Sequence, residues 1–311
     1  MPVLPSVQAL IDFVDAHPQP PLSEITPVES RERLRRITTI FGGPSVKVGH
    51  VGERKIPGPT NEIPLRIYTP QGKGPFAAVV YFHGGGWVQG DLETHDRFCR
   101  MLCDESKMVV IAVDYRLAPE HPFPAGAEDC YDATVWVANH PRAINIDADR
   151  LAVMGDSAGG NLAAVVALMA RDRHGPALRL QVPLFPVTDY NFDTTSYTAN
   201  AEGYLLEKAS MEWYWGHYVR DEAEGVEPYA SPLRAADLSG VAAAHVVTAE
   251  FDPLVDEGEA YADRLIAAGV PTSRKCYAGQ VHFFTHLPGA IPEADQARAE
   301  IVAALRTALD T

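Results

Sequence analysis

The sequence predicts an α/β protein with a mostly parallel central sheet and helices on both of its faces. From residue 76 onward, apolar segments of strand length alternate with segments of helical periodicity. This alternation is typical of strand-helix-strand units, which build parallel sheets that are buried on both sides. The chain has 311 residues, of which 46% are hydrophobic, so it can form a large core within a single unit.

Two helices are predicted ahead of this alternation. Apolar residues recur at helical spacing over residues 7–16 and stop before a proline-rich stretch. A second helix begins after Thr26, because Pro27 and Glu29 follow it in the positions of a capping box. This second helix is expected to end near Gly42.

The strands and helices of the sheet region are assigned from apolar runs and their periodicity. Strands at about 46–56 and 63–68, separated by a Pro/Gly turn, are expected to form an antiparallel pair. The later strands are predicted at 77–82, 108–113, 151–154, 178–184, 244–249 and 273–277. The helices between and after them are predicted at 94–106, 126–139, 159–172, 257–268 and 293–309.

One long segment, between residues 185 and 244, interrupts the alternation and is rich in aromatic residues. Two interpretations are open, and both can hold. The segment is either a helical excursion with a small core of its own, or a lid whose inner aromatic side chains line an apolar pocket. We expect the core in residues 46–188 and 226–311, with cap helices in 1–45 and 189–225.

Composition excludes several classes of partner. The formal net charge of −15 disfavours nucleic acid and anionic membrane surfaces. Residues 1–20 lack the pattern of a signal peptide, and no stretch approaches the run of about 18 apolar residues that crosses a bilayer, so a cytoplasmic protein without a membrane span is expected. Four cysteines do not make a disulfide scaffold, and Cys99 and Cys103 are predicted to be half-buried thiols on one helix face.

Ser157 lies in the run Gly155-Asp156-Ser157-Ala158-Gly159, between a short apolar strand and an alanine-rich helix. The two glycines leave room for a turn so tight that the serine backbone is strained and its hydroxyl is pushed out above the sheet. The helix directs free N–H groups and the positive end of its dipole at the same point. This context favours a nucleophilic serine over the alternative, an ordinary glycine-serine turn.

A serine nucleophile needs a base, an acid that orients the base, and N–H donors for the developing oxyanion. Donors are predicted in the run His83-Gly84-Gly85-Gly86-Trp87, which directly follows the strand at 77–82. Its glycines leave backbone N–H groups free to point at a ligand, whereas the alternative is a flexible turn. His83 is interpreted as holding this loop in shape.

The acid and the base are sought after the last two strands. Asp252 lies just past the end of the strand at 244–249, and ligands gather beyond such strand ends in open α/β sheets. Glu250 and Asp256 compete with it, but Glu250 is expected to point to the opposite side and Asp256 to serve as a helix N-cap. Of eleven histidines, only His282 and His286 follow the last strand, and His282 is preferred as the base because it is closer to the strand end.

Four motifs together resemble the bacterial hormone-sensitive-lipase family of carboxylesterases, which has the α/β-hydrolase fold with a helical cap. The resemblance covers nearly the whole chain, and the motifs are His83 to Trp87, Tyr115 to Ala125, Gly155 to Leu162, and Asp252 to Leu254. Asp156 assigns the chain to the branch with Asp rather than Thr before the nucleophile. The chain has Phe283-Phe284 where family members usually have a glycine after the histidine.

The resemblance implies a role for each matching residue. It makes Ser157 the nucleophile, His282 the base and Asp252 its orienting acid, in the chain order that the fold requires. It assigns the oxyanion hole to the N–H groups of Gly85, Gly86 and Ala158. The residues expected to contact substrate are Trp87, Asp156, Tyr190, Tyr204, Leu205, Trp213 and Phe283.

The expected function is hydrolysis of short- to medium-chain acyl esters through an acyl-enzyme intermediate, with a small-molecule ester as substrate. No cofactor or metal is expected, and a homodimer is an open alternative to a monomer. An amidase, thioesterase or lactonase on the same three residues is the alternative activity, because a fold does not set the leaving group. A ligand-binding receptor on an inactive scaffold is disfavoured, since all three residues are present.

Overall fold

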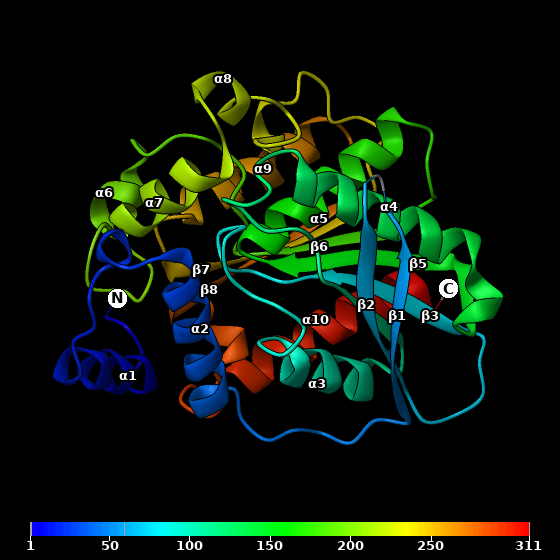
Figure 1. Ribbon diagram of the computed structural model, residues 1–311, viewed down its shortest axis with the longest axis horizontal. Helices are drawn as coiled ribbons and strands as arrows, with labels where there is room; N and C mark the ends of the chain where they lie inside the picture. The colour runs from blue at the N-terminus through cyan, green and yellow to red at the C-terminus, as the bar shows by residue number, and fades with distance from the viewer. Residues whose placement is uncertain (1, 59, 311) are drawn as a thin grey trace.

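The computed structural model, which describes residues 2–58 and 60–310, contains an eight-stranded sheet in the order β1-β2-β4-β3-β5-β6-β7-β8 (Figure 1). Strand β2 is antiparallel to both β1 and β4, and the strands from β4 to β8 are parallel. The strands are β1 (His50–Pro57), β2 (Glu62–Thr69), β3 (Phe76–Phe82), β4 (Val109–Val113), β5 (Ile146–Asp156), β6 (Leu180–Leu184), β7 (Ala244–Phe251) and β8 (Thr272–Val281). The predicted mostly parallel α/β sheet is confirmed.

Helices cover both faces of the sheet because its central strands are apolar on both sides. In β3, Val80 and Phe82 belong to one hydrophobic cluster, whereas Val79 and Tyr81 belong to the other. The first cluster is completed by α4 (Ala125–Asn139), α5 (Ala158–Asp172) and α9 (Val255–Ala267). The second is completed by α3 (Asp96–Ser106) and α10 (Ala294–Leu309), which lie together below the sheet in Figure 1.

The N-terminal region forms α1 (Pro5–Ala16), η1 (Leu22–Glu24) and α2 (Pro27–Phe41). The capping box at the start of α2 is confirmed, with the Glu29 N–H donating to Thr26 Oγ1 at 3.2 Å and the Thr26 N–H donating to Glu29 Oε2 at 2.8 Å. The Leu4 N–H donates to the Gly279 carbonyl at 3.0 Å, which fixes the start of α1 against β8.

Two arginines connect α2 to the glycine-rich segment that follows β3. Arg31 donates to the carbonyl oxygens of Val88 at 2.7 Å and Ala118 at 3.0 Å. Arg35 forms an ion pair with Asp91 at 2.5 Å. Helix α2 therefore braces this loop from outside the sheet.

The aromatic-rich segment between β6 and β7 contains α6 (Thr195–Ala199), α7 (Lys208–Tyr218), α8 (Glu222–Gly225) and η3 (Pro232–Arg234). Helices α6 and α7 lie at the same end of the molecule as α1 and α2 (Figure 1), and α7 contacts η1. The segment is helical, as expected, and many of its aromatic side chains are buried.

The two ends of this insertion are bonded to one another and to the core, in an arrangement that we call the clasp. The Leu233 N–H donates to the Thr188 carbonyl at 2.9 Å, and the Tyr190 N–H donates to Ser231 Oγ at 2.8 Å. The Thr188 N–H donates to the carboxyl of Glu257 at 2.6 Å. Burial raises the pKa of Glu257 well above its usual value, although the backbone N–H groups of Thr188 and Asp189 that it accepts oppose this shift.

The remaining elements are η2 (Pro141–Ala143) and η4 (Phe284–His286). Two expectations need correction. Strand β5 begins at Ile146 rather than at 151, and the thiols of Cys99 and Cys103 are fully buried rather than half-buried, both with 0% exposure. Within the described ranges, no helix is long and apolar enough to span a membrane.

Candidate active site

Ser157 lies on the turn between β5 and α5 in a strained backbone conformation, with φ 57° and ψ −120°. Residues other than glycine seldom adopt a positive φ of this kind, and such a conformation persists only where the surrounding structure enforces it. The chain around Ser157 does so. A Cβ on Gly159 would collide with the Phe82 carbonyl, and the Ser157 N–H donates to the Leu184 carbonyl at 2.8 Å. The turn that carries the serine is thus held against the ends of β3 and β6.

Asp252 and His282 are brought together by the pairing of the last two strands. Phe251 and Val281 are register partners at the carboxyl ends of β7 and β8, so the next residue of each strand leaves the sheet beside the other. His282 Nδ1 is 2.6 Å from Asp252 Oδ2, with exposures of 7% and 0% respectively. The second carboxylate oxygen accepts the Leu254 N–H at 2.9 Å. The carboxylate thus holds the imidazole by Nδ1 and leaves Nε2 directed elsewhere.

The structure places Ser157 at the same edge of the sheet as this pair. Within the described chain, however, the Ser157 hydroxyl forms no hydrogen bond with His282. The Phe185 ring, which directly follows β6, meets the His282 ring edge-on at 4.9 Å. Such contacts between nucleophile and base are often long in free enzymes and shorten when substrate binds.

The two competing carboxylates have other partners. Glu250 accepts the Gly279 N–H at 2.7 Å, and Asp256 accepts the Ser196 N–H at 2.8 Å. The prediction that Asp256 caps α9 is wrong, because α9 begins at Val255 and Asp256 lies inside its first turn. Asp256 instead fixes the start of α6, because it accepts a hydrogen bond from the Ser196 backbone, 60 positions away in the sequence.

The glycine-rich loop after β3 contacts Asp156, the residue before Ser157, through the Gly84 N–H at 3.0 Å. Gly85 and Gly86 have φ values of 116° and 59°. Among the described residues, no acceptor bonds the N–H groups of Gly85 and Gly86, or that of Ala158 at the start of α5. Three donors are therefore free near the nucleophile, as an oxyanion site requires.

His83 supports this loop from behind, as predicted. Its Nδ1 bonds the Gly84 carbonyl at 2.9 Å, and its ring stacks on Tyr115 at 4.3 Å. Burial, reinforced by repulsion from His95, lowers the pKa of His83 to about 4. The imidazole is neutral at physiological pH.

Asp156 is buried beneath the loop, with 0% exposure. Its carboxylate accepts bonds from the Tyr81 hydroxyl at 2.6 Å and the Gly84 N–H at 3.0 Å. Burial alone would raise its pKa, but the imidazoles of His286 and His95 and the Tyr81 hydroxyl outweigh that effect and hold the pKa below its usual value. This environment favours a positioning role over the predicted contact with substrate.

Sequence reasoning did not associate His95 or Tyr81 with the site, and it considered His286 only as a competing base. His95, Asp156 and His286 offer ligand atoms within 4.8 Å of one another, a spacing that a metal ion could use. The Tyr81 hydroxyl bonds both Asp156 and His286, so hydrogen bonds already occupy the position between them. The cluster is explained by these bonds without a metal.

The predicted substrate-contacting aromatic side chains pack against two different hydrophobic clusters. Trp87, Tyr190 and Trp213 belong to the cluster on the α5 side, where Trp87 stacks on Tyr218 at 4.0 Å. Tyr204 and Phe283 pack against the other cluster.

The second group lies near the ends of the last two strands. The Tyr204 ring is 5.0 Å from Phe251, and Phe283 stacks on His286 at 4.5 Å. Leu205 is 37% exposed and has a φ of 48°. Tyr204 and Phe283 therefore lie near the strand ends that carry Asp252 and His282.

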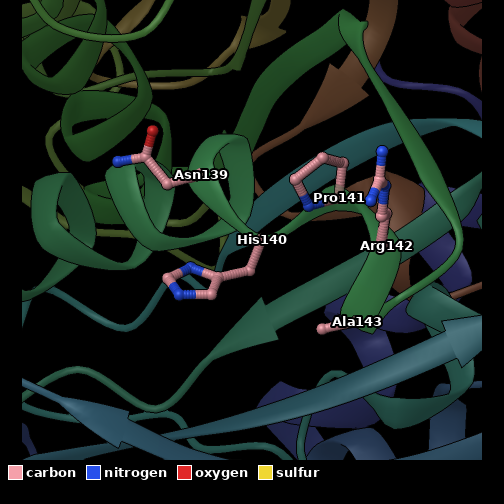
Figure 2. Close-up of a pocket in the computed structure, with 5 residues that line it drawn as sticks. All are labelled: Asn139, His140, Pro141, Arg142 and Ala143. Atoms are coloured by element: carbon pink, nitrogen blue, oxygen red, sulfur yellow. The ribbon is translucent and has the colours of Figure 1, made fainter.

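Figure 2 shows an open pocket of about 370 Å³ lined by Asn139, His140, Pro141, Arg142 and Ala143. These residues lie between the end of α4 and the start of β5. That is the amino-terminal edge of the strand, whereas Ser157 lies beyond its carboxyl end. This pocket is therefore separate from the candidate active site.

The chain is similar to known hydrolases in sequence. A family described as the alpha/beta hydrolase fold matches residues 79–286. The chain is 43% identical over 288 residues to the carboxylic ester hydrolase LipN of Mycobacterium tuberculosis, covering 91% of this chain and 76% of that protein. It is 41% identical over 248 residues to an ethyl acetate hydrolase of Pseudomonas putida, covering 78% of each.

Among solved structures, the chain resembles the ester hydrolase EH1AB1 from the metagenome of Lake Arreo, which was determined in complex with a derivative of bipyridine phosphonate. The TM-score is 0.96 at 39% sequence identity, and the match covers 99% of this chain and 100% of the other.

Proposed function

The chain belongs to the hormone-sensitive-lipase-like branch of the α/β-hydrolase family and is a carboxylic ester hydrolase, and on this premise we propose that it cleaves short- to medium-chain acyl esters through Ser157, His282 and Asp252. The observation that carries the proposal is the buried 2.6 Å bond between His282 and Asp252, at the same sheet edge as the strained Ser157. A carboxylate in this position holds the imidazole in the tautomer that can accept a proton at Nε2.

The reaction proceeds in two acyl transfers. Ser157 Oγ attacks the ester carbonyl while His282 Nε2 takes the hydroxyl proton, and the N–H groups of Gly85, Gly86 and Ala158 bind the oxyanion. The C–O bond to the alcohol breaks as His282 returns the proton to the leaving oxygen. Water, deprotonated by His282, then attacks the acyl-enzyme and releases the acid.

The preference for shorter acyl chains is supported by the packing above the oxyanion loop. The Tyr214 ring lies so close to Gly86 that a Cβ there would collide with it, and Trp87 is enclosed by Tyr218 and Trp215. Bulky aromatic rings therefore pack beside the loop that is proposed to bind the oxyanion, which supports a site for shorter acyl groups. The relative named as an ethyl acetate hydrolase also supports a short acid.

We assign the cap to residues 1–45 and 189–225, and the core to 46–188 and 226–311. The support is that α1, α2 and α6 to α8 all lie outside the strand-helix alternation. Amide, thioester or lactone cleavage by the same residues is the alternative.

The test is a panel of p-nitrophenyl acetate, butyrate, octanoate and palmitate, with p-nitroacetanilide as the matched amide. The proposal expects kcat/KM to be high from acetate to octanoate and much lower for palmitate and the amide. A maximum at palmitate would contradict the chain-length preference. Comparable rates on the amide would favour the alternative activity.

A further inference from the structure

A buried polar chain connects three loops that reach the active site from different strands. Tyr81 precedes the glycine-rich loop in β3, Asp156 directly precedes Ser157, and His286 ends η4 just after His282. Their exposures are 0%, 0% and 4%. The proposed mechanism uses none of these side chains.

The hydrogen atoms in this chain can be assigned from its partners. The Tyr81 hydroxyl donates to Asp156 Oδ1 at 2.6 Å, so at the 2.8 Å contact with His286 it must accept from Nε2–H. His286 Nδ1 then accepts from the Thr285 hydroxyl at 2.9 Å. This neutral tautomer agrees with burial, which lowers the pKa of His286 to about 3.

Asp156 extends the chain to the oxyanion loop. The carboxylate oxygen that binds Tyr81 also accepts the Gly84 N–H at 3.0 Å. A Cβ on Gly84 would collide with the other oxygen, so loop and carboxylate are in close contact. Gly84 immediately precedes Gly85 and Gly86, and a shift of the carboxylate would move both.

The His286 ring is fixed by its neighbours. It is sandwiched between Phe98, stacked at 4.0 Å, and Phe283, stacked at 4.5 Å. A ring held on both faces keeps Nε2–H aimed at Tyr81. The end of the chain is therefore rigid, as a support for a loop needs to be.

We propose that His286 is a positioning residue, which acts through Tyr81 and Asp156 to fix the loop that carries the oxyanion donors relative to the loop that carries His282. The proposal rests on the proposed function, because it takes Gly85 and Gly86 as oxyanion donors. It gives the second histidine after β8 a role distinct from that of the base.

The test compares two variants of similar size, His286→Gln and His286→Leu. Both lose the ring and its stacking, but glutamine can place an N–H where Nε2 lies and leucine cannot. Tyr81→Phe removes the other half of the same bond. Tyr261→Phe is the control. Tyr261 lies in α9, and its buried hydroxyl donates to Gln181 of β6 at 3.0 Å rather than to any of these loops.

Two readouts separate positioning from stability. One is kcat and KM for p-nitrophenyl acetate. The other is the inhibition constant of a trifluoromethyl ketone, which forms an oxyanion on the serine, against that of the matched methyl ketone, which binds without doing so. We expect Tyr81→Phe and His286→Leu to lower kcat about 10-fold and to weaken only the trifluoromethyl ketone by a similar factor. His286→Gln should recover most of the loss, and Tyr261→Phe should show none.

The double variant Tyr81→Phe/His286→Leu should be no worse than the poorer single variant, because both remove the same interaction. A lower melting temperature with unchanged kcat and an unchanged ratio of the two ketones would overturn the proposal. If His286→Leu does not fold, Tyr81→Phe decides alone.

The proposed function is tested separately on the wild-type protein. Covalent labelling of Ser157 by a fluorophosphonate, together with turnover of the acetate ester, supports it whatever the His286 variants do. Labelling elsewhere would contradict the proposed function and remove the ground for the positioning role.

Discussion

Ser157 shows how a residue's environment can impose a costly conformation. A positive φ costs a side chain on the order of 1–3 kcal/mol, which the surrounding bonds must offset. The bond from the Ser157 N–H to the Leu184 carbonyl and the close approach of Gly159 to Phe82 do this. Because the hydroxyl itself bonds no described residue, the conformation does not depend on it.

Ser157→Ala should therefore abolish nearly all ester turnover and leave the melting temperature close to that of the wild type. The residual rate should come from substrate binding and the oxyanion donors alone, roughly 10³-fold above the reaction in water. The measurements are steady-state kinetics and circular dichroism. A variant that keeps a substantial fraction of wild-type kcat would contradict the assignment of the nucleophile.

Asp252→Asn and Asp256→Asn form a matched pair of carboxylate removals. Asparagine at 252 can present its amide to His282 Nδ1 and select the wrong tautomer, so kcat should fall by about 10⁴-fold. Asparagine at 256 keeps an oxygen for the Ser196 N–H and should change kcat less than about 3-fold. Kinetics on p-nitrophenyl acetate decide between them, and the reverse ranking would mean that the wrong acid has been assigned.

Sequence context was sufficient to predict that Ser157, Asp252 and His282 lie at one edge of the sheet, because each follows the end of a recognisable strand. It was not sufficient for the chain of bonds beneath them. Tyr81 and His286 are 205 positions apart, and nothing near either residue indicates the other. Asp256 was misassigned because its partner, Ser196, also comes from a distant segment.

At the scale of elements, the predicted strands and helices from residue 76 onward are all present, because buried parallel strands and amphipathic helices have strong local patterns. The order of the strands was not predicted, since β4 lies between β2 and β3 only by virtue of tertiary packing. The helices inside the segment between β6 and β7 were not delimited either, because aromatic residues crowd that segment without a clear period.

Helix α2 contacts the glycine-rich loop, in addition to its proposed place in the cap. Its Arg31 and Arg35 hold the loop that contains Val88 and Asp91, next to the proposed oxyanion donors. Removing the first 43 residues would thus disturb the loop as well as any wall of the acyl pocket. Hydrolysis of acetyl esters should suffer along with that of longer ones.

Arg31→Ala isolates this brace. We expect kcat to fall roughly 3–10-fold on p-nitrophenyl acetate and octanoate alike, because the bonds to the Val88 and Ala118 carbonyls and the ion pair with Glu120 are lost. Arg33→Ala is the control on the same helix, since its guanidinium donates to the Pro20 carbonyl and to no other acceptor within residues 2–58 and 60–310. Equal effects of the two variants, or a loss confined to the octanoate, would contradict a brace on the loop.

At the scale of the whole molecule, the buried histidines make folding sensitive to acid. Burial lowers the pKa of His286 to about 3 and that of His83 to about 4, whereas an unfolded histidine titrates near pH ~6.5. Between these values the unfolded chain binds more protons than the folded chain. The stability that these two neutral histidines contribute is therefore fully present above about pH 6.5 and is lost progressively as the pH falls toward about 3.

The melting temperature should accordingly fall between pH 7 and pH 4.5, and His286→Gln should fall less over that interval than the wild type. Asp156 favours the charged form of His286, but burial together with His95, His282 and Arg298 opposes it. Thermal unfolding followed by circular dichroism at several pH values gives the comparison. Parallel curves for the two proteins would show that His286 does not contribute to the acid sensitivity.

The clasp also bears on how this architecture can diversify. Because the Leu233 N–H is bonded to the Thr188 carbonyl, the chain leaves the core and returns to it at adjacent points. The entropic cost of closing a loop rises slowly with its length, by about 0.6 kcal/mol per doubling. The length of the insertion can therefore change at a small cost in folding free energy. Its length and composition can change between relatives, and with them the shape of the pocket, while the strands that carry nucleophile, acid and base keep their register.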